Sequence, residues 1–217
     1  MKFASACTTT LGSLLVLVAT PANLVNAECS DVHVVFARGS GEMAGLGLCG
    51  EPLVSGITSN LGGMSVSSYA VNYAASADQT SAGPGATDMT NHVVSIAQEC
   101  PNTAFVLGGY SQGASVTSIA IGIKTMLGSG DSIPENLAPR IKAVVTFGNP
   151  LKMMGQTIES SSQTYGPKAV EFCGQGDPVC GGGFNFMAHM SYPMDSVPAA
   201  AEKAAALVKG GARTLRG

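Results

Sequence analysis

The chain has 217 residues, of which 45% are hydrophobic and only 12% are charged, and its formal net charge is −3. That length suits one domain or a small pair, and so few charges allow a large buried core beneath a fairly apolar surface. Because the sequence is slightly acidic and has no basic cluster, nucleic acids and anionic membranes are not expected as partners.

The first 27 residues have the pattern of a secretory signal peptide. Lys2 gives a positive start, residues 11–19 form an apolar run that is too short to cross a bilayer, and small residues precede Glu28. A membrane anchor or a core helix is the alternative for this segment. We expect a secreted, extracellular monomer whose residues 28–217 form one domain, with a net charge of 10 − 14 = −4 after loss of Lys2.

Strand-like and helix-like segments alternate along the remaining chain. Runs of apolar and β-branched residues predict strands at 32–37, 65–73, 103–110, 141–147 and 169–172. Apolar residues at helical spacing predict helices at 52–61, 86–99, 112–127 and 199–208. Loops are expected at 128–136 and 174–193, whereas residues 151–167 have no clear pattern. The alternation predicts an α/β fold, a three-layer α/β/α sandwich around a parallel sheet of about five strands.

Small and polar residues follow several of the predicted strands. Active sites in open parallel sheets lie outside the carboxyl ends of the strands. The residues that come directly after predicted strands are Gly39-Ser40, Ser111, Gly148 and Cys173. We therefore expect the functional residues to gather at this edge of the sheet.

The segment Gly109-Tyr110-Ser111-Gln112-Gly113 lies between a predicted strand and a predicted helix, which is the setting of a nucleophile elbow. Glycines on both sides relieve the crowding of a sharp turn, and the turn lifts the serine hydroxyl above the sheet. An ordinary strand-to-helix turn is the alternative, but the flanking segments favour Ser111 as a nucleophile.

A nucleophilic serine needs a base, and only three histidines are present. In this arrangement the order along the chain is serine, acid, histidine, and His189 is the only histidine after Ser111. His33 lies inside the first predicted strand and His92 on a predicted helix, where structural roles are expected.

The acid that orients the histidine should lie between Ser111 and His189. Order along the chain allows five candidates: Asp131, Glu135, Glu159, Glu171 and Asp177. Asp177 follows a strand and lies in a loop between Cys173 and Cys180, and a disulfide closing that loop would hold its carboxylate still. A fixed acid keeps the imidazole in the right tautomer. An exposed loop aspartate is the alternative, and the local sequence favours neither.

Two donors are expected to form an oxyanion hole. The backbone N–H of Gln112 lies at the start of a helix, where a developing negative charge is stabilised. Ser40 follows the first strand at the same edge and offers its N–H and its hydroxyl. A plain turn residue is the alternative for Ser40.

Five cysteines remain once Cys7 is lost with the signal peptide: Cys29, Cys49, Cys100, Cys173 and Cys180. In a secreted chain this predicts two disulfides and one free thiol. Spacing alone does not fix the pairing, although Cys173 and Cys180 are the easiest to join. A zinc site is not expected, because no histidine has ligand spacing.

The stretch Gly45-Leu46-Gly47-Leu48-Cys49-Gly50 matches a dinucleotide fingerprint only in its letters. It comes too late after the preceding strand, and no acid follows about twenty residues on to hold a ribose. Neither a cofactor nor a metal is therefore expected.

These stretches together resemble the cutinase family of serine esterases. The matching segments are 35–40 (VFARGS), 71–76 (VNYAAS), 100–114, 173–180 and 188–192 (AHMSY). They occur in order over nearly all of residues 28–210. The resemblance implies a small α/β-hydrolase, and no long amphipathic insert is present that would serve as a lid.

The resemblance also implies roles for individual residues. Ser111 would be the nucleophile, Asp177 the acid and His189 the base, with Ser40 and the Gln112 N–H as the oxyanion hole. It implies the disulfides Cys29–Cys100 and Cys173–Cys180. Cys49 matches no cysteine of the family's usual pairs.

Apolar residues on two segments are candidates for binding the substrate. Phe184, Phe186 and Met187 precede His189, whereas Leu46 and Leu48 follow the proposed oxyanion segment. They predict two apolar rims around the serine, suited to an aliphatic acyl chain, and packing into the core is the alternative. Val179, between the paired cysteines, is a further candidate.

The resemblance implies hydrolysis of cutin-like aliphatic polyesters, and an esterase for acetylated xylan, short-chain esters or lipids is the alternative. A non-catalytic recognition protein on the same fold is the third reading, and the intact set of serine, acid and histidine argues against it.

Overall fold

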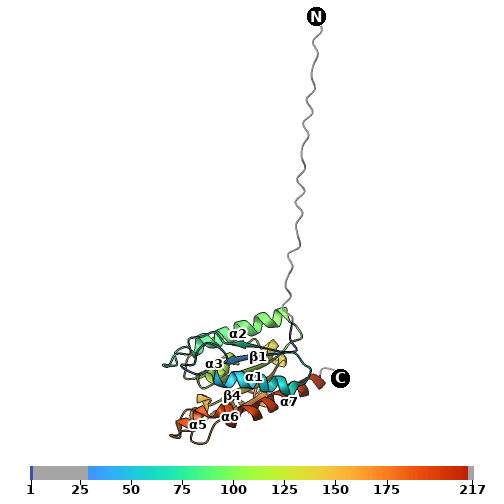
Figure 1. The fold of residues 1–217 in the computed structure, drawn as a ribbon. Coiled ribbons are helices and arrows are strands. Elements are labelled where there is room, and N and C mark those ends of the chain that lie inside the picture. Colours follow the sequence, from blue (N-terminus) through green and yellow to red (C-terminus); the bar gives the residue numbers. More distant parts are fainter. Residues whose placement is uncertain (2–28, 215–217) are drawn as a thin grey trace.

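The computed structural model describes residues 1 and 29–214 (Figure 1). The expected signal peptide and Cys7 lie outside the described residues. Five parallel strands form one sheet in the order β2-β1-β3-β4-β5. The strands are β1 (Val32–Ala37), β2 (Val66–Ala70), β3 (Ala104–Tyr110), β4 (Ile141–Phe147) and β5 (Ala169–Phe172). The predicted parallel sheet is thus confirmed.

Helices cover both faces of this sheet (Figure 1). On one face lie α2 (Ala82–Glu99) and α3 (Gln112–Ala120), and on the other lie α1 (Gly47–Leu61) and α7 (Val197–Thr214). Alternate residues of the central strands serve the two cores, so Val35 and Leu107 face α2 and α3, whereas Phe36 and Val106 face α1 and α7. Strands buried on both faces read as continuous apolar runs, which is why the sequence predicted them well.

The helix after β3 ends earlier than predicted. Apolar residues continue to Leu127, but α3 ends at Ala120. Gly122 has φ of +83°, its N–H donates to the carbonyl of Ile119, and the N–H of Ile123 donates to the carbonyl of Ser118. This pair of bonds is a Schellman motif, which terminates a helix at a glycine in the left-handed region.

The glycine-rich stretch 174–193 is not a loop throughout, so that prediction is wrong from Phe186 onward. It contains α5 (Phe186–Met190) and the start of α6 (Tyr192–Asp195). The Asn185 side chain accepts a hydrogen bond from the N–H of Met187 and so begins α5. The patternless region 151–167 contains the short helices η2 (Pro150–Met154), α4 (Ile158–Ser161) and η3 (Gly166–Lys168), and η1 (Glu135–Arg140) precedes β4.

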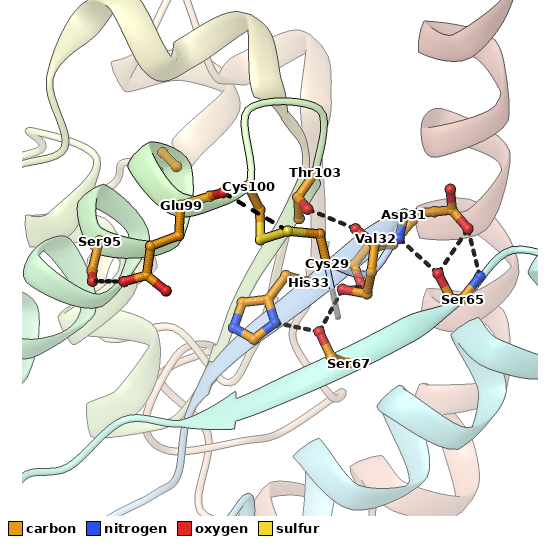
Figure 2. Close-up of a disulfide and its surroundings, with 12 residues drawn as sticks. Cys29, Asp31, Val32, His33, Ser65, Ser67, Ser95, Glu99, Cys100 and Thr103 are labelled. Atoms are coloured by element: carbon orange, nitrogen blue, oxygen red, sulfur yellow. Dashed lines mark hydrogen bonds between the residues drawn. A yellow bond between two sulfur atoms is a disulfide. The ribbon is translucent and has the colours of Figure 1, made fainter. Parts of the chain in front are cut away.

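Two disulfides join the described cysteines. Cys29 is bonded to Cys100, which ties the start of the described domain to the end of α2, and Cys173 is bonded to Cys180 across a short loop. Figure 2 shows the first of these beside Thr103, whose hydroxyl donates to the carbonyl of Ser30. Cys49 is free and fully buried in α1, and burial raises the pKa of its thiol far above the usual range.

A histidine pair, of which His33 is buried and His92 is half-buried, lies near the Cys29–Cys100 disulfide. Figure 2 shows the hydrogen bond between the His33 ring and the Ser67 hydroxyl. The Nδ1 atom of His33 lies 2.6 Å from this hydroxyl, and its Nε2 atom lies 2.8 Å from Nε2 of His92. Two neutral imidazoles can share one N–H···N bond, whereas two protonated ones repel each other. Burial, with a smaller contribution from His92, lowers the pKa of His33 to about 4.

Because of this histidine pair, we expect the protein to lose stability in acid. An unfolded histidine has a pKa of about 6.5, so the unfolded chain binds more protons than the folded one between about pH 6.5 and 4. The free energy of unfolding therefore falls as the pH drops through that window, by about 3 kcal/mol for His33. Urea unfolding at the two ends of the window should show a smaller loss for His33→Gln than for the unmodified protein. Equal losses would exclude His33 as the cause.

Candidate active site

Ser111 occupies a strained turn between β3 and α3. Its φ is +56° and its ψ −119°, a conformation that non-glycine residues rarely adopt. The Ser111 N–H donates to the carbonyl of Phe147 at the end of β4, at 2.9 Å, so the neighbouring strand holds the turn. Such strain is concentrated at functional sites, where the surrounding structure maintains it.

The two glycines of the segment are required by close backbone contacts. A Cβ atom on Gly109 would lie 2.0 Å from the carbonyl oxygen of Gly113, and one on Gly113 would lie 2.0 Å from that of Ala37. Both distances are far below van der Waals contact. The start of α3 therefore packs directly on the ends of β3 and β1, which leaves the Ser111 side chain at the carboxyl edge of the sheet.

A chain of hydrogen bonds joins Ser111 to His189 and Asp177. His189 Nε2 lies 2.9 Å from Ser111 Oγ, and His189 Nδ1 lies 2.8 Å from Asp177 Oδ2. A carboxylate only accepts, so Nδ1 carries the proton and Nε2 is free to accept from the serine hydroxyl. The side chains come from the elbow after β3, from α5 and from the loop after β5, and the structure thus brings the three predicted residues together.

The Asp177 carboxylate is fully buried, with an exposed fraction of 0%. Burial opposes its ionisation, but hydrogen bonds from Tyr192, His189 and the Val179 N–H outweigh that effect and hold its pKa below the usual range. The disulfide between Cys173 and Cys180 closes the loop around it. The group is therefore a fixed anion at neutral pH.

His189 is held at its main chain and at its ring. The Tyr110 hydroxyl donates to the His189 carbonyl at 2.8 Å, and a Cβ on Gly148 would lie 2.6 Å from the imidazole Cε1. Only 3% of His189 is exposed. Gly148, which the sequence placed at this edge, thus makes room for the ring.

The predicted oxyanion donors lie on segments that pack together. Gln112 is the first residue of α3, so its N–H has no helical acceptor, and its buried side chain is tied to the Ser76 carbonyl and the Ser81 hydroxyl. Ser40 follows β1, which pairs with β3 up to Ala37 and Gly109. Ser40 is half-buried, and its N–H makes no backbone hydrogen bond among the described turns and loops.

Sequence reasoning missed the residues that fix the segment carrying Ser40. The Arg38 guanidinium is buried and donates to the carbonyls of Glu42, Val71 and Tyr73, and the Tyr73 hydroxyl donates back to the Arg38 carbonyl. The position of Arg38 directly after a buried strand could have indicated this role, because a buried cation needs hydrogen-bond acceptors such as main-chain carbonyls.

Residues predicted to bind substrate differ in exposure. Phe184 is fully exposed at 101%, and Phe186 and Met187 are also exposed beside His189, with the Phe186 ring 5.8 Å from the imidazole. Leu46 and Leu48 are half-buried and pack against the core formed with α1 and α7. Val179 is half-buried and contacts Asp177 through its N–H.

Comparison with known proteins identifies the family. The family model described as Cutinase matches residues 28–208. A cutinase of Kineococcus radiotolerans is 57% identical over 155 residues, which are 71% of this chain but only 53% of that protein. The probable carboxylesterase Culp3 of Mycobacterium tuberculosis is 42% identical over 83% of this chain and 68% of its own length.

Solved structures agree with this match. A Trichoderma reesei cutinase in complex with a C11Y4 phosphonate inhibitor is 30% identical, with a TM-score of 0.62 over 86% of this chain and 78% of that one. An acetylxylan esterase shares the fold at a TM-score of 0.72 and 24% identity, over 84% of this chain and 99% of that one. The chain therefore belongs to the cutinase family.

Proposed function

We propose that this protein is a secreted serine esterase that hydrolyses carboxylic esters, and that its substrates are cutin-like aliphatic polyesters. The observation that carries the proposal is the hydrogen-bonded chain from Ser111 through His189 to the buried Asp177, with Ser111 on a strained elbow. Cutinase and carboxylesterase relatives support the reaction class. The two disulfides and the expected signal peptide support secretion.

The first half of the reaction forms an acyl-enzyme. His189 Nε2 takes the proton of Ser111 as Oγ attacks the ester carbonyl carbon. The N–H groups of Ser40 and Gln112, with the Ser40 hydroxyl, stabilise the oxyanion of the tetrahedral intermediate. The intermediate collapses as His189 returns the proton to the leaving alcohol.

The second half regenerates the enzyme. Water enters where the alcohol left, gives its proton to His189 Nε2 and attacks the acyl carbon. Collapse of the second intermediate returns the proton to Ser111 Oγ and releases the carboxylic acid. Asp177 remains ionised throughout and stabilises the imidazolium of each step.

The preference for polyesters rests on the surface beside His189. Several large apolar side chains on and around α5 and α6 are exposed: Phe184, Phe186, Met187, Met190 and Met194. An exposed apolar rim suits an aliphatic chain that stays attached to a solid polymer. The resemblance to cutinases implies the same preference for polyesters.

Two assays together test the substrate. We expect rates on soluble p-nitrophenyl esters to rise from acetate to medium chain lengths, and we expect monomers to be released from cutin. Release of acetate from acetylxylan or of fatty acid from phospholipid, without attack on cutin, would replace the polyester with one of the alternative esters. No ester hydrolysis above that of Ser111→Ala would reject the esterase altogether.

The Ser40 hydroxyl is expected to contribute to the oxyanion hole. Ser40→Ala should lower kcat by about 10²–10³ on a butyrate ester and leave KM nearly unchanged, because the donor acts mainly in the transition state. Steady-state kinetics would measure both constants. Ser68→Ala, an exposed serine on β2, is the matched control, and an unchanged kcat in Ser40→Ala would remove the hydroxyl from the mechanism.

A further inference from the structure

The hydroxyl of Tyr192 contacts the same carboxylate oxygen that holds His189. It lies 2.5 Å from Asp177 Oδ2, which also accepts from His189 Nδ1 at 2.8 Å. Tyr192 is 1% exposed and is among the largest fully buried side chains. A phenol that donates to this oxygen competes with the imidazole for its lone pairs and its charge.

The position of this hydroxyl is fixed by further contacts. It accepts a hydrogen bond from the Gly174 N–H at 2.9 Å, and it lies 3.5 Å from Sγ of Cys180. Because the phenol oxygen is occupied as an acceptor, its proton is directed at Asp177. The ring packs against His189, Tyr110 and Phe147, with centroids 6.0, 6.0 and 5.8 Å away.

The contact also has an electrostatic consequence. The Tyr192 hydroxyl lowers the pKa of Asp177, and burial raises the pKa of Tyr192 far above its usual range, so the phenol remains a donor. The titratable groups around it are Asp177 from the loop after β5, His189 from α5 and Tyr110 from β3. Of these, only Asp177 is charged when His189 is neutral.

We propose that Tyr192 is a positioning residue for the reaction, which orients the Asp177 carboxylate and limits how strongly that carboxylate attracts a proton onto His189. The proposal rests on the proposed esterase function. Removing the hydroxyl leaves more negative charge on Oδ2 and frees the carboxylate to rotate. The first effect favours the protonated imidazole in the resting enzyme, and the second weakens its alignment with Ser111.

Tyr192→Phe tests the proposal, because it removes the hydroxyl and keeps the ring. We expect kcat/KM on a butyrate ester to fall by about 10- to 100-fold at neutral pH. We also expect the acid limb of the pH profile of kcat/KM, which reports the base of the free enzyme, to move to higher pH. A purely structural role for Tyr192 would lower the rate without moving this limb.

Tyr110→Phe is the matched control. Its hydroxyl donates to the main-chain carbonyl of His189 and not to Asp177, so its loss should leave the acid limb in place. If Tyr192→Phe folds poorly, 3-fluorotyrosine at position 192 keeps the fold and donates more strongly, and the limb should then move to lower pH.

The outcomes separate this inference from the proposed function. An active wild type whose profile keeps its acid limb in the Tyr192 variants overturns the positioning role alone. So does an equal shift of the limb in Tyr110→Phe. A wild type no more active than Ser111→Ala overturns the esterase and the positioning role together.

Discussion

Ser111→Ala should lower kcat for ester hydrolysis by about 10⁶-fold, which is the loss expected when the nucleophile of a hydrogen-bonded triad is removed. Alanine has no oxygen to attack the carbonyl, and His189 then has no serine proton to accept. The small remaining rate would come from the oxyanion donors and from binding of the ester, and it would need water as the nucleophile. Hydrolysis of p-nitrophenyl butyrate measures the loss.

The fold should survive this substitution, because alanine removes only an oxygen whose partner is the imidazole. A phosphonate probe that reacts with activated serines should label Ser111 in the wild type, and peptide mapping should find no labelled peptide in Ser111→Ala. Ser55→Ala, an exposed serine on α1, is the control and should retain both activity and labelling. A Ser111→Ala protein of near wild-type activity would place the nucleophile elsewhere.

The sequence predicted the sheet better than the helix ends. Both ends of the central strands 32–37 and 141–147 were predicted correctly. Strands buried on both faces form long apolar runs, and polar residues mark where these runs begin and end. The end of α3 was missed, because apolar residues continue past Gly122. There the left-handed glycine, rather than the pattern, stops the helix.

The residues of the candidate site also differ in how well the sequence predicted them. Ser111 and His189 were predicted from a local motif and from order along the chain, which need no knowledge of contacts. The local sequence did not distinguish Asp177 as the acid from an exposed loop aspartate, and only the resemblance favoured it. In the structure its carboxylate lies 2.8 Å from His189 Nδ1. The sequence predicted no role for Arg38 or Tyr192. The role of each depends on the carbonyls or carboxylate that its side chain contacts after folding.

Leu46 and Leu48 show that a sequence pattern does not predict how exposed a side chain is. Their apolar side chains suit both a substrate rim and packing into the core, and Leu48 is the second residue of α1. Both side chains pack partly against the core, whereas Phe184 and Phe186 lie in the open. Exposure depends on the neighbours that folding provides, and a sequence pattern does not contain them.

Asp177→Asn should lower kcat by about 10⁴-fold while leaving the shape of the site intact. Asparagine is the same size, but its amide N–H₂ group can donate to His189 Nδ1, and the proton of the imidazole then resides on Nε2. An Nε2 that carries a proton cannot accept one from Ser111, so the serine loses its base. The carboxylate charge that stabilises the imidazolium is lost as well.

Two measurements separate this effect from a loss of folding. The melting temperature and circular dichroism of Asp177→Asn should show a folded protein, while p-nitrophenyl butyrate hydrolysis falls to a small fraction of the wild-type rate. Asp195→Asn, an exposed aspartate in the helix that carries Tyr192, makes the same chemical change without touching His189 and should keep full activity. If Asp177→Asn lost no more than about tenfold in kcat, the acid would have to come from another residue. The buried hydrogen bond between Asp177 and His189 would then be structural, and the positioning role of Tyr192 would fail with it.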